Sequence, residues 1–211
     1  MPQITEIAWF PLRSGHETTE AGAALRNLAP QLRAQPGLVS AWHGNPLERP
    51  QSGEFVNVWD SEESYKASES SPLKAQATKL VGELLDASEP SLKPYHNAVP
   101  FSKPFETVAA APVVQVSSFF LPADVDKAAF EAAFDSVLKA VYGNPPDGFV
   151  VGAHGWALES VNGAKVFATI SGWQSIEKRV AAHAGIAEKF AEIQKFTNVV
   201  EVHHTSFKRR E

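Results

Sequence analysis

Histidine and tryptophan are the residue types in this sequence that are best suited to chemistry on a small molecule. The 211 residues include seven His and five Trp but no Cys. Histidine is the side chain whose ordinary pKa lies near neutrality, so it is the natural group to accept or donate a proton. The absence of Cys excludes thiolate nucleophiles, disulfides, iron–sulfur clusters and Cys-type zinc sites. The histidines are therefore the first candidates for catalysis.

Two of the histidines occupy the same place in a repeated segment. Residues 37–48 align without a gap with residues 148–159, and the two segments share Gly, Val, His, Gly, Leu and Glu. His43 and His154 are equivalent in this alignment. Small residues and a following glycine accompany each imidazole, which leaves room for a cavity beside it. We expect at least one of the pair to be functional, and the alternative is an inherited structural hydrogen bond.

Two further matches follow in the same order. Trp59 and the Asp-Ser that follows it return as Trp173 and Gln-Ser, and His96 near the end of the first half is matched with His203 near the end of the second. Three matches in one order predict a tandem duplication.

Each half is predicted to contain four strands and two helices in the order βαββαβ. Apolar runs and turn residues place the strands, and apolar side chains at helical spacing place the helices, with Pro30 expected to kink or split the first of them. Helix starts are expected at Ser61, near Gln174 and at Asp124, which has the residue type of an N-cap. The expected strands, besides the two that carry His43 and His154, are 4–12, 54–59, 93–101, 113–121, 165–173 and 199–207, and the first helix is expected over about 17–35.

The predicted fold class is α+β, with two ferredoxin-like βαββαβ repeats that form a pseudo-dimeric α/β barrel. The expected divisions are a first repeat over 1–101, a linker over 102–112 that is rich in Pro and Ala, and a second repeat over 113–211. Helices would cover one face of each antiparallel sheet, so the other face must be buried against a partner. The second repeat would supply that partner internally, and we therefore expect a monomer.

The remaining candidates follow from position. His183 lies near the apolar stripe of the last helix and is a candidate for acid–base chemistry. His96 and His203 lie on the last strand of each half and are candidates for contact with a ligand, although His43 and His96 are expected on opposite edges of one sheet. Trp42 and Trp156 are strand aromatics that could line a cavity for an apolar ring.

The first half has a Pro-Gly step at residues 36–37 and then Trp59, followed by Asp-Ser-Glu-Glu and Tyr65. This pattern resembles the antibiotic biosynthesis monooxygenase domain of the dimeric α/β-barrel superfamily. The resemblance covers most of residues 4–101 and, more loosely, the second half. It implies that Trp59 and Tyr65 line the substrate pocket. Trp173 keeps the tryptophan in the second half, whereas Arg179 stands in the place of the tyrosine. The resemblance also implies chemistry without a cofactor.

The composition narrows the partners. A net charge of −5 and the lack of a basic block argue against nucleic acid, and no apolar stretch is long enough for a membrane span. His43 and Glu48 are separated by an odd number of positions and face opposite sides of a strand, so no metal site is expected, and no phosphate or flavin motif is present. We expect a cytoplasmic, cofactor-independent enzyme, a monooxygenase of secondary metabolism that acts on an aromatic or polyketide-like substrate. The alternatives are a cyclase, dehydratase or lyase that uses His acid–base chemistry, and a non-catalytic binding protein.

Overall fold

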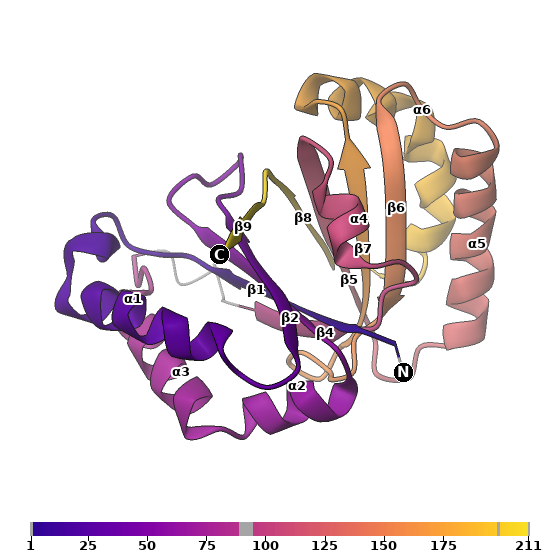
Figure 1. Ribbon diagram of the computed structural model, residues 1–211. Coiled ribbons are helices and arrows are strands. Elements are labelled where there is room, and N and C mark those ends of the chain that lie inside the picture. Colours follow the sequence, from indigo (N-terminus) through magenta and orange to yellow (C-terminus); the bar gives the residue numbers. More distant parts are fainter. Residues whose placement is uncertain (1, 89–94, 198, 211) are drawn as a thin grey trace. The chain divides into compact units, whose positions relative to one another are not determined.

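The computed structural model describes residues 2–88, 95–197 and 199–210. The chain divides into two compact units, of which the first comprises residues 1–101 together with 207–211 and the second comprises residues 102–206. Figure 1 shows that each unit has its own sheet and its own helices.

Unit 1 contains a five-stranded sheet covered on one face by helices. The strand order is β4-β1-β3-β2-β9, and the described pairings are antiparallel. Helices α1 and α3 pack against each other. The elements are β1 (Ile4–Phe10), the short 3-10 helix η1 (His16–Thr18), α1 (Glu20–Arg33), β2 (Leu38–Gly44), β3 (Gly53–Trp59), α2 (Glu62–Glu69), α3 (Pro72–Leu84), β4 (Tyr95–Val99) and β9 (Lys208–Arg210).

Unit 2 repeats this arrangement with a four-stranded antiparallel sheet. Its strand order, read from the other edge, is β8-β5-β7-β6, which matches β4-β1-β3-β2 of unit 1. Helices α5 and α6 pack together on one face of the sheet (Figure 1). The elements are α4 (Phe105–Ala109), β5 (Val113–Leu121), α5 (Lys127–Gly143), β6 (Phe149–Trp156), β7 (Lys165–Trp173), α6 (Ile176–Gln194) and β8 (Val199–Thr205). The predicted α+β class with two ferredoxin-like βαββαβ repeats is confirmed.

Two segments differ from the expected divisions. The segment expected as a linker, 102–112, contains helix α4, whose Phe105 and Val108 are fully buried against the sheet of unit 2. The segment packs onto the sheet because the apolar side chains of Phe105 and Val108 are removed from water there. The C-terminal strand β9, expected as part of the second repeat, pairs with β2 and extends the sheet of unit 1.

Local sequence signals explain most helix boundaries. Ser61 and Ser175 accept hydrogen bonds from the backbone of Ser64 and Lys178 and begin α2 and α6, close to the expected starts. The second helix of unit 1 is interrupted, because Ser71 caps a new helix whose first residue is a proline.

Two expectations about helices need correction. The cap of α5 is Asp126, whose side chain accepts from the backbone of Ala129, and not Asp124. Pro30 does not split α1, which continues to Arg33. The missing N–H costs α1 one backbone hydrogen bond, to the carbonyl of residue 26, and the helix continues for three residues beyond the proline.

The equivalence expected between His96 and His203 is wrong by one residue. His96 pairs with Ala8 on β1, whereas His203 pairs with Val116 on β5. Ile4 pairs with Trp59 in unit 1, and Val113 pairs with Trp173 in unit 2, so Ile4 and Val113 are equivalent. Ala8 and Ser117 each lie four residues further on, so they are equivalent too. A shift of one residue places two side chains on opposite faces of a sheet, so His96 and His203 face different surroundings.

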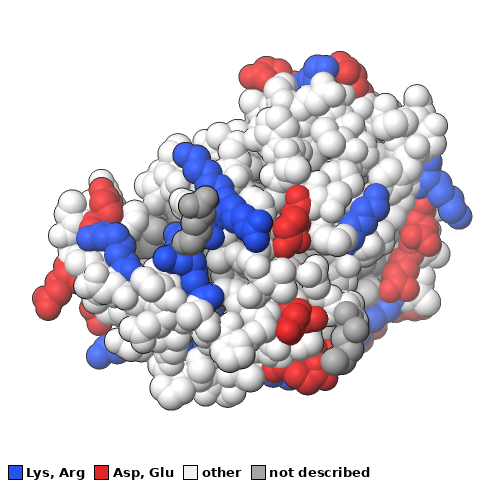
Figure 2. All heavy atoms as spheres, in the orientation of Figure 1, with Lys and Arg blue, Asp and Glu red and all other residues white. Residues whose placement is uncertain are grey.

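Charged side chains of both signs are scattered over the face shown in Figure 2. None of the helices in the described residues is long and apolar enough to cross a membrane.

Candidate functional site

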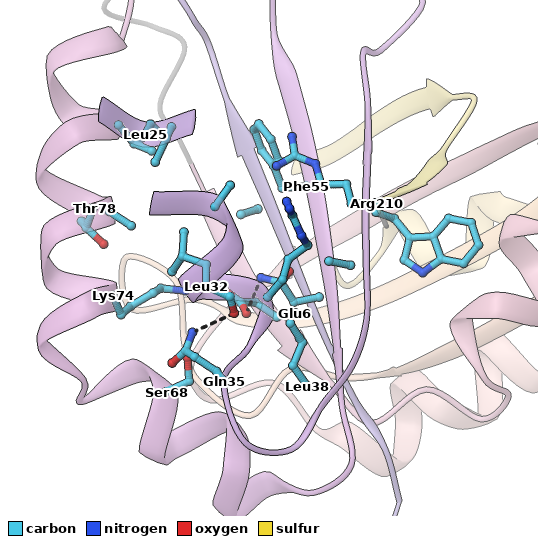
Figure 3. A pocket seen from close by; sticks show the side chains of 18 of the residues that line it. Glu6, Leu25, Leu32, Gln35, Leu38, Phe55, Ser68, Lys74, Thr78 and Arg210 are labelled. Carbon is cyan, nitrogen blue, oxygen red and sulfur yellow. Dashed lines mark hydrogen bonds and ion pairs between the residues drawn. The ribbon is translucent and has the colours of Figure 1, made fainter. Parts of the chain in front are cut away.

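The main candidate site is a cavity of about 180 Å³ in unit 1, between the sheet and its helices (Figure 3). The sheet contributes alternate residues of β1 and β3, which share one face because side chains alternate along a strand. The helices α1 and α3 contribute mostly aliphatic side chains. The residues that form these walls are Ala8, Phe10, Phe55 and Trp59 from the sheet and Leu25, Ala29, Leu32, Ala77 and Val81 from the helices.

One end of the cavity is polar and is organised around the buried carboxylate of Glu6. The Glu6 side chain is 3% exposed. Its Oε2 accepts hydrogen bonds from Asn57 Nδ2 at 3.1 Å and from Trp59 Nε1 at 3.0 Å. Its Oε1 forms an ion pair with Lys74 Nζ and lies 3.2 Å from His96 Nε2. The His96 contact has the distance of an ion pair but not the angles of a hydrogen bond.

The charges at this end fix the protonation states. Burial alone would raise the pKa of Glu6, but the interaction with His96 and the positive charge of Lys74 hold that pKa well below its usual range. Burial would lower the pKa of Lys74, but Glu6 and Glu69 outweigh it and raise the pKa. Glu6 is therefore an anion and Lys74 a cation at neutral pH, and neither is suited to act as a general base.

Glu6, Glu69 and His96 are residue types that could bind a metal, and their ligand atoms lie within 4.8 Å of one another. The Lys74 ammonium contacts both carboxylates, with its Nζ 2.6 Å from Glu69 Oε1. A lysine at this point supplies the positive charge that an ion would supply, so the cluster is explained without one.

The structure brings several predicted site residues together at this cavity. Trp59 lines it, and β2 contributes Ala41 and Trp42 to its edge. The Trp42 side chain lies on the face of β2 opposite to Ala41, where its indole donates to Ser40 Oγ at 3.0 Å. Tyr65 is 1% exposed on α2, and its ring centroid lies 6.1 Å from that of His96. Tyr65 and His96 therefore lie next to the polar end of the cavity, although they do not form its walls.

His43 lies on β2 on the same face as the cavity residue Ala41, and it pairs with Phe55 on one side and Lys208 on the other. Burial lowers the pKa of His43, and the positive charge of Arg210 lowers it further. The imidazole is therefore neutral at pH 7 and can accept a proton. As expected, His43 and His96 do not meet, because two strands separate β2 from β4.

Unit 2 has a smaller cavity of about 90 Å³ in the equivalent position. His154 lines it between the rings of Phe134 and Phe167, at centroid distances of 5.3 and 5.8 Å, and burial lowers the pKa of His154. Trp173 also lines it, with the Arg179 guanidinium carbon 5.5 Å from its ring centroid.

Three predicted site residues lie away from both cavities. Trp156 packs against the phenylalanine core of unit 2 and donates to Glu131. His183 is exposed on α6. His203 is buried on the edge strand β8 and pairs with Val116.

Sequence reasoning missed the charged residues of the cavity. Glu6 stands in an apolar strand, and a glutamate in such a strand is rarely buried without a partner. That rule could have identified Glu6, but its partner Lys74 is 68 positions away. Arg33 and Arg210 also line the cavity, and Arg210 reaches it only because β9 joins this sheet.

The fold and the position of its cavities define the class of protein as ferredoxin-like α+β, with two such units in one chain. No protein-family model matches the sequence, and no curated protein is similar to it.

Solved structures of low sequence identity share the fold. An anthrone oxidase-like protein has a TM-score of 0.73 at 11% identity, with 100% of this chain and 93% of that chain covered. A candidate monooxygenase from Lactobacillus acidophilus NCFM has a TM-score of 0.56 at 12% identity, over 99% of this chain and 94% of that one. A candidate chlorite dismutase has a TM-score of 0.57 at 12% identity, over 97% and 95%. These neighbours differ in the activity assigned to them, so the similarity establishes the fold and not the reaction.

Proposed function

We propose that the protein is a small-molecule enzyme of the monooxygenase type, which binds an apolar, ring-shaped substrate in the cavity of unit 1 and oxidises it with O₂ without a metal or flavin. The observation that carries this proposal is the cavity itself, whose walls are mostly aliphatic and aromatic and whose buried carboxylate, Glu6, lies at one end. Such a cavity suits a flat, largely apolar molecule with a few polar substituents. Neighbours of the same fold that are described as oxygenases support it.

The proposed reaction is balanced without an external reductant. A CH₂ group flanked by two aryl rings loses a proton and becomes a carbanion. The carbon forms a bond to one oxygen atom of O₂, the second C–H bond and the O–O bond break, and the other oxygen atom leaves as water. The CH₂ becomes C=O and passes four electrons to O₂, so the substrate is the only electron donor.

His43 is the proposed base. It faces the same side of the sheet as the cavity residue Ala41, and its lowered pKa keeps it neutral at pH 7. Trp59 would position the ring of the substrate, because its indole is held by Glu6. Tyr65, whose ring lies beside that of His96, would support the polar end from α2 without touching the substrate.

The test is O₂ uptake with anthrone, measured against the uncatalysed oxidation. We expect one anthraquinone for each O₂ consumed and a loss of about 100-fold in kcat/KM in His43→Ala, which is the lower end of the contribution of a general base. His154→Ala, in the other unit, is the matched control and should retain the wild-type rate. Unchanged turnover in the His43→Ala, His154→Ala double variant would refute a role for either histidine.

A second candidate function is acid–base chemistry without O₂, such as a cyclisation, dehydration or lyase reaction, in the cavity of unit 2. The observation in its favour is that His154 forms part of that cavity wall, with burial holding it neutral. Turnover in the absence of O₂ that depends on His154 and not on His43 would support it. Binding without turnover, unaffected by either substitution, would instead favour a carrier.

We also propose that the two units arose by tandem duplication. The shared strand order β4-β1-β3-β2 and β8-β5-β7-β6 supports it, as does the equivalent place of Trp59 and Trp173 at the ends of β3 and β7.

A further inference from the structure

We infer that the cavity of unit 1 recognises an anion, and that Arg33 and Arg210 bind it. The ligand class is an aromatic molecule that carries an oxyanion on or beside its ring. This inference deepens the proposed function and relies on it for one point only, namely that the ligand occupies this cavity.

Arg210 reaches the cavity because the last strand of the chain belongs to the sheet of unit 1. It pairs with Ala41 of β2, and its guanidinium carbon lies 4.9 Å from the ring centroid of Phe55, a cavity wall residue. Figure 3 shows the Arg210 side chain beside Phe55. Neighbouring side chains on a strand point to opposite faces. Arg209 accordingly lies over the ring of Trp42, which is on the other face of β2.

Arg33 comes from the last turn of α1, on the helical side of the same cavity. Burial lowers the pKa of Arg210, and repulsion by the charge of Arg33 lowers it further. Both guanidinium groups line a largely apolar cavity and repel each other, which is an arrangement that an anion between them would stabilise.

The protein does not supply a counter-charge from the residues that the structure describes. Neither Arg33 nor Arg210 forms an ion pair with a described carboxylate. Within the described part of the cavity wall the carboxylate is that of Glu6, and it is already engaged by Lys74, Asn57 and Trp59. An anionic ligand would relieve the repulsion and accept hydrogen bonds from both guanidinium groups, which present planar sets of donors that match a carboxylate or an enolate. The apolar walls require the rest of that ligand to be a hydrophobic ring.

The test compares two probes of nearly equal shape, 2-naphthoate and the neutral 2-naphthamide, by isothermal titration calorimetry. We expect the wild type to bind naphthoate at least tenfold more tightly than naphthamide, the ratio that one hydrogen bond to a charged group supplies. Arg210→Gln should lower this ratio at least threefold and leave the part that Arg33 supplies, while the affinity for naphthamide changes less than threefold. Arg210→Lys keeps the charge without the planar fork and should retain an intermediate ratio.

Two controls locate the effect. Arg209→Gln removes the same charge from the neighbouring position on the opposite face and should keep the wild-type ratio. Thr78→Trp adds a large ring at an exposed position of the cavity wall and should abolish binding of both probes. Circular dichroism confirms that each variant is folded.

The outcomes separate the two proposals. Equal binding of both probes that Thr78→Trp abolishes would overturn the anion inference and leave the proposed site intact. An unchanged ratio in Arg210→Gln would likewise overturn the role of Arg210. Absence of binding, or binding that Thr78→Trp does not affect, would refute this cavity as the site and both proposals with it.

Discussion

Replacement of Glu6 by Gln tests whether the buried charge, and not only the shape of the side chain, holds the polar end of the cavity together. The glutamate accepts on both oxygens, from Asn57 and Trp59 on Oε2 and from Lys74 on Oε1. Glutamine keeps one acceptor and turns the other into an NH₂ donor. In either orientation that NH₂ faces another donor, so at least one buried hydrogen bond is lost and its donor is left unsatisfied.

The cost can be estimated from these contacts. A buried donor left without a partner costs about 1–3 kcal/mol, and breaking a buried ion pair by removal of one partner costs about 3–5 kcal/mol. Lys74 is 22% exposed and retains Glu69, so the ion-pair loss should be smaller than that range. We therefore expect Glu6→Gln to lower the free energy of unfolding by about 3 kcal/mol at pH 7.

Unit 2 supplies a matched comparison for this substitution. Gln115 occupies the position of Glu6, and it is tolerated because its Nε2 donates to Ser117 Oγ at 2.7 Å while its Oε1 accepts from Arg179. The residue equivalent to Ser117 in unit 1 is Ala8, which offers no acceptor. Adding Ala8→Ser to Glu6→Gln should therefore recover about 1 kcal/mol, the contribution of one hydrogen bond. Glu62→Gln, in an exposed ion pair with Lys66, should cost no more than about 0.5 kcal/mol.

Urea denaturation at several pH values provides the assay. The pKa of Glu6 is depressed in the folded state, so the stability that its charge contributes is present above its ordinary value of 4.5 and is lost as the pH falls below it. The difference between wild type and Glu6→Gln should therefore shrink between pH 5 and pH 3. A variant within about 0.5 kcal/mol of wild type at pH 7, or a difference that does not change with pH, would refute this account of the carboxylate.

Three further predictions concern single positions. Gly37 has a φ of 82°, and a Cβ there would meet the Ser64 side chain at 2.2 Å. Gly37→Ala should therefore lower the free energy of unfolding in urea melts by more than about 1 kcal/mol, the scale of backbone strain. Gly82→Ala on α3 is the control, because a Cβ there meets no atom within 4 Å, and it should raise the free energy of unfolding by up to about 1 kcal/mol. Phe105→Ala should cost about 3–5 kcal/mol because the ring is fully buried, and a change below 1 kcal/mol would mean that α4 is only a connector. Burial lowers the pKa of His154, so stability should fall as the pH drops below the ordinary value of 6.5, and His154→Gln should flatten that slope between pH 6.5 and pH 5.

Local signals were sufficient to predict much of the fold. Strands β5 and β7 have the expected bounds, because long apolar runs ended by turn residues determine a strand with little help from the rest of the chain. The starts of α2 and α6 follow from serine caps for the same reason.

Features that depend on contacts between distant residues could not be predicted in this way. Strand β9 is three residues long and pairs with a strand more than 160 positions earlier, so no periodicity marks it. The ion pair of Glu6 with Lys74 joins a strand to a helix that a proline has separated from α2. Because α3 begins at Pro72, Lys74 lies in the first turn of a new helix. The sequence alone predicts one continuous helix here and therefore does not place Lys74 beside Glu6.

The two units place opposite charges on the same framework. Where unit 1 has Glu6 and Tyr65, unit 2 has Gln115 and Arg179, so the equivalent pair of positions carries a negative charge in one cavity and a positive charge in the other. In unit 1 Lys74 supplies the cation that balances Glu6. In unit 2 the Arg179 guanidinium donates a hydrogen bond to the neutral Gln115. The charge at the polar end of unit 1 is therefore compensated within the protein, whereas the polar end of unit 2 carries the guanidinium of Arg179. Two ferredoxin-like repeats can keep the same strand order and the same tryptophan and still differ in the charged groups of their cavities, because a change at two positions on one face alters the charge without disturbing the sheet.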